Sequence, residues 1–265
     1  MAYDVEKVIK IAKAELGYLE KKNGDLNYLY EKTANAGKAN YTKYGRDMHL
    51  LYPEVMDYPA AWCDCFVDWC FMKAYGVSNA RKLLAGDFDD YTVASAQLYK
   101  DKHAWHTEPE IGDQIFFKNG TRICHTGIVV DVLKNSNMVV TIEGNTSNSA
   151  TVVPNGGGVH QKFYKLSRDE IAGYGRPAYG KKFEYTPHWV MSEGTWYYRL
   201  GESENAHGWL VVNHHWYYFH EKSGAMQTGV KIIGGNKYYL EESGELEGAC
   251  NTTDEHGILL PWYVE

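Results

Sequence analysis

Residues 61–70 read AWCDCFVDWC, and the spacing of their large apolar side chains predicts the helix on which the first half of the fold is built. Phe66 and Trp69 follow Cys63 by three and six positions, which is the period of a helix with one apolar face. We therefore expect a helix over residues 62–75. Its first turn carries a cysteine.

The segments on either side of this helix predict an α+β domain. Residues 4–16 have apolar side chains at helical spacing after an Asp at the N-cap position, and residues 93–100 are also helix-like. Further along, short apolar runs alternate with turn residues, which is typical of strands. Helices that precede an antiparallel sheet indicate an α+β fold for residues 1–180. The expected strands are residues 115–117, 127–133 and 138–142.

Residues 188–240 follow a different pattern, a repeat of about twenty positions. Trp189 recurs as Trp209, and Trp196 recurs as Trp216, while a third copy has lost both tryptophans. A fixed period with a turn and an aromatic pair in each unit predicts stacked β-hairpins that share a core between neighbours. We expect an all-β module over residues 188–265, joined to the first domain by a linker at residues 181–187.

Composition and charge exclude several classes of protein. The net charge is −7, and from residue 181 onward there are 6 Lys/Arg against 12 Asp/Glu, which argues against nucleic acid as a partner. No segment is apolar over the length that a membrane span needs, so we expect no membrane partner. The five cysteines have neither disulfide-scaffold nor zinc-knuckle spacing. We expect reduced thiols, no metal and no cofactor.

Three residue types needed for acyl transfer occur in the order Cys63, His125, Glu143. A thiol is mostly protonated at neutral pH and needs a base, and that base needs a third group to fix its tautomer. His125 opens an apolar strand run, and Glu143 ends another, so both can reach one cleft edge. Asn145 either assists the imidazole or only shapes a turn.

The position of Cys63 in the first helical turn favours it over its neighbour as the nucleophile. The positive end of the helix dipole stabilises a thiolate there, and such thiols have pKa values of about 3.5 to 7.5. Cys65 points about 200° away around the helix and cannot face the same cleft. We expect Cys65 and Cys70 to be small buried hydrophobic residues.

Four motifs in this half resemble the CHAP family, the cysteine, histidine-dependent amidohydrolases/peptidases. They are Trp62-Cys63-x-x-Phe66-Val67-x-Trp69-Cys70, Gly112-Asp113 before Ile115-Phe116-Phe117, His125-x-Gly127-Ile128-Val129, and Glu143-Gly144-Asn145. The resemblance covers roughly residues 5–178 and implies a papain-like domain. It also implies that Cys63 is the nucleophile, His125 the base, Glu143 the orienting acid and Asn145 an accessory polar residue. Some relatives bind calcium, but residues 20–60 contain no D-x-D-x-D-G loop.

The repeats are similar to choline-binding or glucan-binding cell-wall repeats, and the run Ser223 to Gly229 completes the second unit closely. In choline-binding members, aromatic side chains enclose a quaternary ammonium group through cation–π attraction. Carbohydrate stacking is another interpretation, and packing of a thin hairpin core is a third. The residues that match the ligand positions are Trp189, Trp196, Trp209, Trp216, Tyr218 and Met226.

The two resemblances together predict a modular, endolysin-like peptidoglycan hydrolase. The expected reaction is cleavage of a cell-wall amide bond, either as an N-acetylmuramoyl-L-alanine amidase or as a peptidoglycan endopeptidase. Expected partners are bacterial peptidoglycan and a choline-bearing teichoic acid or other wall glycan. The N-terminus does not resemble a secretory signal, so we expect synthesis in the cytoplasm and a phage lysin-like release to the wall. The alternatives are a non-catalytic wall-binding adhesin and an acyltransferase on the same fold.

Overall fold

The computed structural model describes residues 3–180, 187–201, 204–213 and 215–250. The chain divides into two compact units, Met1–Phe183 and Glu184–Glu265. The predicted linker, residues 181–187, lies outside the described residues except for its last position.

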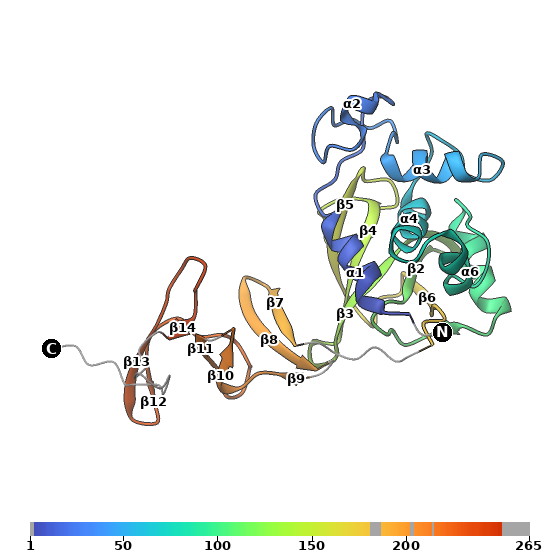
Figure 1. The fold of residues 1–265 in the computed structure, drawn as a ribbon. Coiled ribbons are helices and arrows are strands. Elements are labelled where there is room, and N and C mark those ends of the chain that lie inside the picture. The colour runs from blue at the N-terminus through green and yellow to red at the C-terminus, as the bar shows by residue number, and fades with distance from the viewer. Residues whose placement is uncertain (1–2, 181–186, 202–203, 214, 251–265) are drawn as a thin grey trace. The chain divides into compact units, whose positions relative to one another are not determined.

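The first unit is an α+β domain in which helices precede a six-stranded antiparallel sheet (Figure 1). The strand order is β1-β6-β2-β3-β4-β5, so the two central strands are β2 and β3. The helices are α1 Val5–Ala14, α2 Leu26–Leu29, α3 Lys43–Leu51, α4 Cys63–Tyr75, α5 Val77–Leu83 and α6 Thr92–Asp101. The strands are β1 Trp105–His106, β2 Gln114–Asn119, β3 Arg122–Leu133, β4 Met138–Thr146, β5 Gly158–Lys165 and β6 Ile171–Gly175, with a 3-10 turn at Lys134–Ser136.

Helix α4 occupies the centre of this unit, as its sequence predicts. Its first nine residues are all buried, Asp64 and Asp68 included, so the helix is covered on all sides and not only on the one apolar face that its spacing predicts. It contacts α1, α3 and α5 as well as β3 and β4. The helix ends at Gly76, whose φ of 76° places it in the left-handed region that suits glycine.

Close packing fixes the start of α4 against β4. A Cβ atom on Gly144 would lie 2.5 Å from Phe66 Cβ and 2.9 Å from a ring carbon of Trp62, so only glycine fits there. The indole nitrogen of Trp62 also donates a hydrogen bond to Glu20 at 3.0 Å. These contacts hold the first turn of α4 over the strand that carries Glu143.

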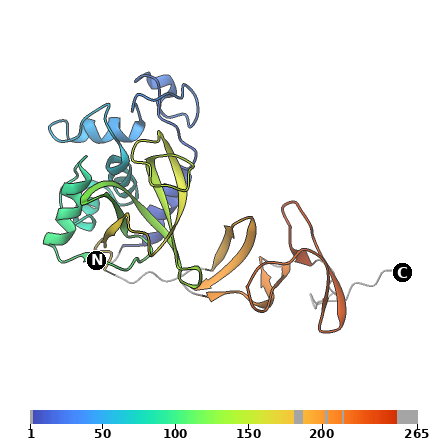
Figure 2. The ribbon, with the colours of Figure 1, turned by 180° about the vertical axis from the view of Figure 1, so that it is seen from behind.

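The predicted helix at residues 4–16 is confirmed as α1, which begins after its N-cap Asp4. The strands are longer than the sequence predicts. His125 does not open its strand but lies inside β3, and Glu143 does not end its strand but lies inside β4. The ribbon seen from behind shows these two long strands side by side (Figure 2), and they pair in antiparallel register.

The second unit consists of successive antiparallel hairpins, as the twenty-residue repeat predicts. Turns that contain a left-handed residue, such as Gly194, connect their strands. The fold class is therefore confirmed as α+β followed by an all-β repeat module. Its strands are β7 His188–Ser192, β8 Thr195–Gly201, β9 Glu204–Asn205, β10 Gly208–Val212, β11 His215–Phe219, β12 Gly229–Ile233, β13 Asn236–Leu240 and β14 Ala249–Cys250.

Candidate functional site

Cys63 is the first residue of α4, and its side chain lies against β3. Only 5% of the residue is exposed. Backbone N–H groups of Asp64 and Thr126 hydrogen-bond to its sulfur and favour the thiolate. Thr126 directly follows His125, so this contact sets the sulfur against the backbone of β3 one residue beyond the predicted base.

His125 and Glu143 form a buried pair across β3 and β4. The imidazole Nε2 lies 2.9 Å from Glu143 Oε2, and neither side chain has any exposed area. The Phe117 ring stacks on the imidazole at a centroid distance of 5.8 Å. With Nε2–H donated to a carboxylate, the neutral ring presents Nδ1 as a proton acceptor.

Two hydroxyl groups hold the Glu143 carboxylate in position. Thr141 Oγ1 donates to Oε1 at 2.5 Å, and the Tyr164 hydroxyl donates to Oε2 at 3.2 Å. These two hydrogen bonds fix the orientation of the carboxylate beside the imidazole. Glu143 can therefore orient the His125 ring and stabilise its cation.

The second imidazole nitrogen, Nδ1, takes no part in the hydrogen bond to Glu143. His125 Nδ1 is buried and has no hydrogen-bond partner among the described residues. Buried polar atoms are normally satisfied, so an unpartnered ring nitrogen on the strand that contacts the thiol is a candidate proton acceptor.

Asn145 lies in β4, two residues after Glu143, where the pairing of β4 with β5 shifts register. It has a φ of 54°, and its Oδ1 accepts a hydrogen bond from the Gly157 amide at 3.3 Å. Its Nδ2 atom is buried and has no partner among the described residues. The side chain shapes the loop between β4 and β5, next to the buried pair.

The other two cysteines of α4 are separated from the site. Cys65 is buried, and its sulfur contacts the sulfur of Met56 at 3.8 Å. Cys70 is completely buried one and a half turns further along the helix. Burial raises the pKa of both thiols well above the ordinary value.

The low pKa that the helix N-terminus predicts for the Cys63 thiol is wrong. Burial raises the pKa of this thiol to about 12, and the charge of the neighbouring Asp64 adds to the effect. The backbone amides at the start of α4 and that of Thr126 in β3 act in the opposite direction but do not compensate for the lost hydration. Cys63 is therefore a neutral thiol in the free protein, and its proton leaves only when a base takes it.

The alkylation rate of Cys63 should follow from this raised pKa. Because only the thiolate reacts, the rate with iodoacetamide should rise about tenfold per pH unit from pH 6 to pH 10 without a plateau. Mass spectrometry of the peptide that contains Cys63 measures it, with the same peptide in the denatured chain as the reference. A rate that is already constant below pH 7 would instead show a preformed thiolate–imidazolium pair.

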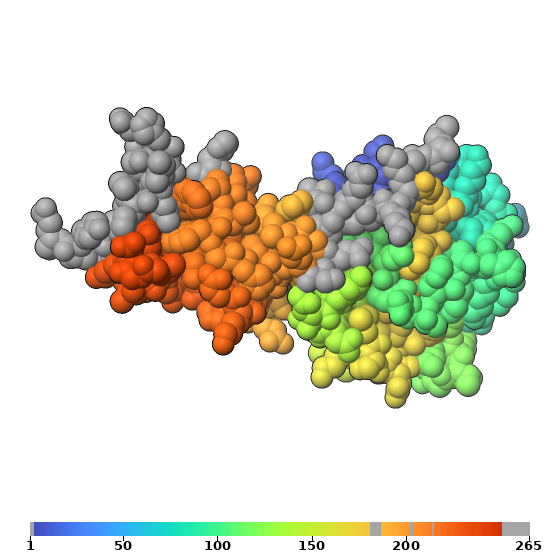
Figure 3. Space-filling model, turned by 90° about the horizontal axis from the view of Figure 1, so that it is seen from below, coloured from blue at the N-terminus to red at the C-terminus, as the bar shows by residue number. Residues whose placement is uncertain are grey.

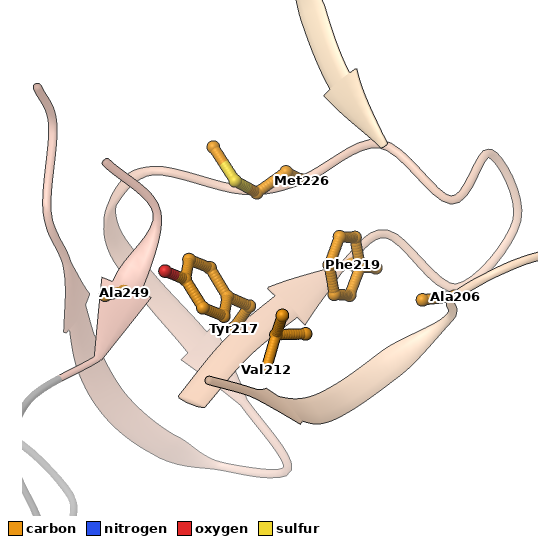
Figure 4. Packing of buried hydrophobic residues seen from close by; sticks show 6 residues of the cluster. All are labelled: Ala206, Val212, Tyr217, Phe219, Met226 and Ala249. Atoms are coloured by element: carbon orange, nitrogen blue, oxygen red, sulfur yellow. The ribbon is translucent and has the colours of Figure 1, made fainter. Parts of the chain in front are cut away.

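In the second unit, an aromatic cavity of about 260 Å³ lies between neighbouring hairpins. Trp189 and Trp196 come from the first hairpin, and Tyr217 comes from the next, 4.7 Å from Trp189 by ring centroids. Figure 4 shows Met226 on the same side of β11 as Tyr217. Glu245 and Glu247 also line the cavity.

Trp209 and Trp216 form a second set of the same geometry. Tyr238 packs on Trp209 at 4.9 Å, which repeats the contact of Tyr217 with Trp189. The predicted residue Tyr218 belongs to this second set, 5.1 Å from Trp209. Tyr217, which the sequence did not single out, occupies the first set because alternate residues of a strand face opposite sides.

Neither a metal site nor a membrane span is found in the described parts of the chain. Within residues 3–180, 187–201, 204–213 and 215–250, no three His, Cys, Asp or Glu side chains form a group that could hold a metal ion. No helix in those ranges has the length and apolar character required to cross a bilayer.

One segment of each unit matches a known protein family. Residues 54–145 match the CHAP domain, and this segment contains Cys63, His125, Glu143 and Asn145. Residues 206–247 match the choline-binding repeat. The chain thus combines a CHAP domain with choline-binding repeats, as the resemblances predict, and no curated protein matches it.

Solved structures similar to parts of the chain include three proteins with choline-binding or lytic names. The choline-binding domain of Spr1274 from Streptococcus pneumoniae is 28% identical over 26% of this chain and 100% of that one, with a TM-score of 0.22. The modular Cpl-1 endolysin, complexed with a peptidoglycan analogue, is 34% identical over 25% of this chain and 18% of that one, with a TM-score of 0.22. CbpJ from Streptococcus pneumoniae TIGR4 is 18% identical over 56% and 47%, with a TM-score of 0.24.

Proposed function

We propose that this chain, in which a CHAP domain precedes choline-binding repeats, is a peptidoglycan hydrolase that cleaves an amide bond of the bacterial cell wall. The observation that carries the proposal is the buried His125–Glu143 pair, whose Nδ1 has no partner among the described residues, on the strand whose Thr126 amide contacts the Cys63 sulfur. A structural ion pair has no need of a neighbouring thiol or an unsatisfied ring nitrogen.

The proposed reaction starts from the neutral thiol. His125 Nδ1 takes the proton of Cys63 as the sulfur attacks the amide carbonyl, and amide groups at the start of α4 receive the developing oxyanion. The imidazolium then protonates the leaving amine, which leaves a thioester on Cys63. A water molecule, deprotonated by His125, hydrolyses the thioester. Glu143 keeps Nε2–H in place and stabilises the cation in both steps.

The repeats would hold the enzyme on choline-bearing teichoic acid. The rings of Trp189, Trp196 and Tyr217 offer π faces to a quaternary ammonium group. The carboxylates of Glu245 and Glu247 add negative charge to the same cavity, which favours a cation over a neutral glycan. Tethering raises the local concentration of peptidoglycan without altering the catalytic groups.

Mass analysis of digested peptidoglycan tests the function and identifies the bond. We expect the purified chain to release fragments from insoluble wall. A free lactyl carboxylate beside an intact stem peptide identifies an N-acetylmuramoyl-L-alanine amidase, and new amino-acid amines within the peptide identify an endopeptidase. Wall that is bound but yields no new carboxylate or amine would contradict the hydrolase and favour an adhesin.

A further inference from the structure

A cavity of about 360 Å³ in the first unit is lined in part by β3, the strand that carries His125. It is lined by residues of α6, β1, β2, β3 and β6 and of the turns between them. Figure 3 shows that green and yellow segments of the chain adjoin on the surface of this unit. Its side chains include three cations and two aromatic rings, which are Lys100, Lys118, Arg122, Tyr91 and Trp105.

The charge of this cavity is uncompensated. No Asp or Glu lines it, and in the described part of the chain none of Lys100, Lys118 and Arg122 has an ion-pair partner. Lys100 Nζ lies 4.7 Å from the Trp105 ring centroid, and the Arg122 guanidinium lies 5.6 Å from that of Tyr91. In a chain of net charge −7, three cations around one cavity that no carboxylate lines favour an anion there.

Two elements connect the cavity to the catalytic groups. Ile123 of β3 lines it, and His125 lies two residues further along the same strand, about 7 Å away at strand spacing. Ser95 of α6 donates a hydrogen bond at 2.6 Å to Asp64, the residue after Cys63. A substrate bound at Cys63 that runs along β3 would reach the cavity within two or three residues.

We infer that this cavity is a substrate subsite that binds a carboxylate on the peptide part of the wall polymer. Lys100, Lys118 and Arg122 supply the positive charge, and the rings of Tyr91 and Trp105 flank the apolar part of the bound group. The inference rests on the proposed function, because it assigns a position to the substrate of that reaction. A phosphate group has the same charge, so the experiments must separate the two anions.

Steady-state kinetics on soluble muramyl peptides test the subsite. The parent protein should cleave a substrate with free carboxylates at a KM about tenfold below that of the same substrate with amidated carboxylates. The variant Lys100→Gln/Lys118→Gln/Arg122→Gln should lose this preference through KM, with kcat within about twofold of the parent. The control Lys7→Gln/Lys10→Gln/Lys13→Gln removes the same charge from exposed positions of α1 and should keep the preference.

A variant with one substitution shows whether a folding defect causes the loss of preference. Lys118→Gln removes the one lining cation that has no ring contact within the described part of the chain, so it should keep the parent's thermal unfolding midpoint while it loses part of the preference. A triple variant and a Lys118→Gln variant that both discriminate as the parent does would overturn the inference.

A binding measurement separates failure of the subsite from failure of the proposed function. The full chain with Cys63→Ser is titrated with the two peptides in the presence of saturating choline, which occupies the repeats. Tighter binding of the free carboxylates that disappears in the triple variant supports the subsite even if no hydrolysis is found. Equal binding of both peptides, or competition by inorganic phosphate as strong as that by the free-carboxylate peptide, contradicts it even if the enzyme is active.

Discussion

Replacing Cys63 with alanine is expected to lower the rate of wall hydrolysis at least about a thousandfold, because no other group in the site can form the thioester. The variant should still bind wall through its repeats, since the two units are separate compact bodies. The release of soluble fragments from purified peptidoglycan measures the first effect, and retention of the protein on the wall pellet measures the second.

Cys65→Ala provides the matched control for this prediction. It removes the same thiol from the same helix two residues later, but that sulfur contacts Met56. Hydrolysis should remain within about twofold of the parent, at a small cost in stability for the lost packing. If Cys63→Ala released fragments as fast as the parent, the thiol mechanism would be wrong. If only Cys65→Ala were inactive, the nucleophile would be misassigned.

The architecture follows from local patterns in the sequence, but the extent of the strands does not. Helix α4 and the hairpins are visible as periods of 3.6 and of about twenty residues. Strand β3 begins at Arg122, before the apolar run, because polar residues such as His125 and Thr126 find buried partners across the sheet. Such partners lie far apart in the sequence, so hydrophobic periodicity alone predicts strands that are too short.

The environment of Cys63 was equally inaccessible to sequence reasoning. A helix N-terminus is a local feature and predicts a low thiol pKa. Burial depends on how α4, α6 and the sheet pack, and it brings Asp64 into a buried network with Ser95 and Gln114. Burial raises the pKa of Asp64 to about 7, and a carboxylate so close to the sulfur further disfavours the thiolate. The effect of burial on the pKa of Cys63 is opposite in sign to that of the helix N-terminus, and it is larger.

The aromatic cavity illustrates the same limit in a repeat. The sequence identifies Trp189, Trp196 and Met226, but it does not reveal which tyrosine of the next hairpin completes the set. Tyr217 and Tyr218 are adjacent and face opposite sides of β11, and only the stacking of hairpins decides that Tyr217 faces Trp189. Once that register is known, Tyr238 takes the corresponding place beside Trp209.

Replacing Trp196 with alanine is expected to weaken choline binding at the first cavity about tenfold or more, because one ring contributes about 0.5 to 2 kcal/mol of cation–π attraction in addition to its apolar contact. Calorimetric titration with choline measures this, and the neutral isostere 3,3-dimethylbutan-1-ol isolates the charge-dependent part.

Tyr197→Ala is the control, since this neighbouring aromatic residue lies on the opposite face of β8 and should leave the affinity unchanged. Glu245→Gln/Glu247→Gln should reduce the preference for choline over the neutral isostere. Equal affinity of the parent protein for both compounds would refute a cation site and favour stacking on a neutral glycan.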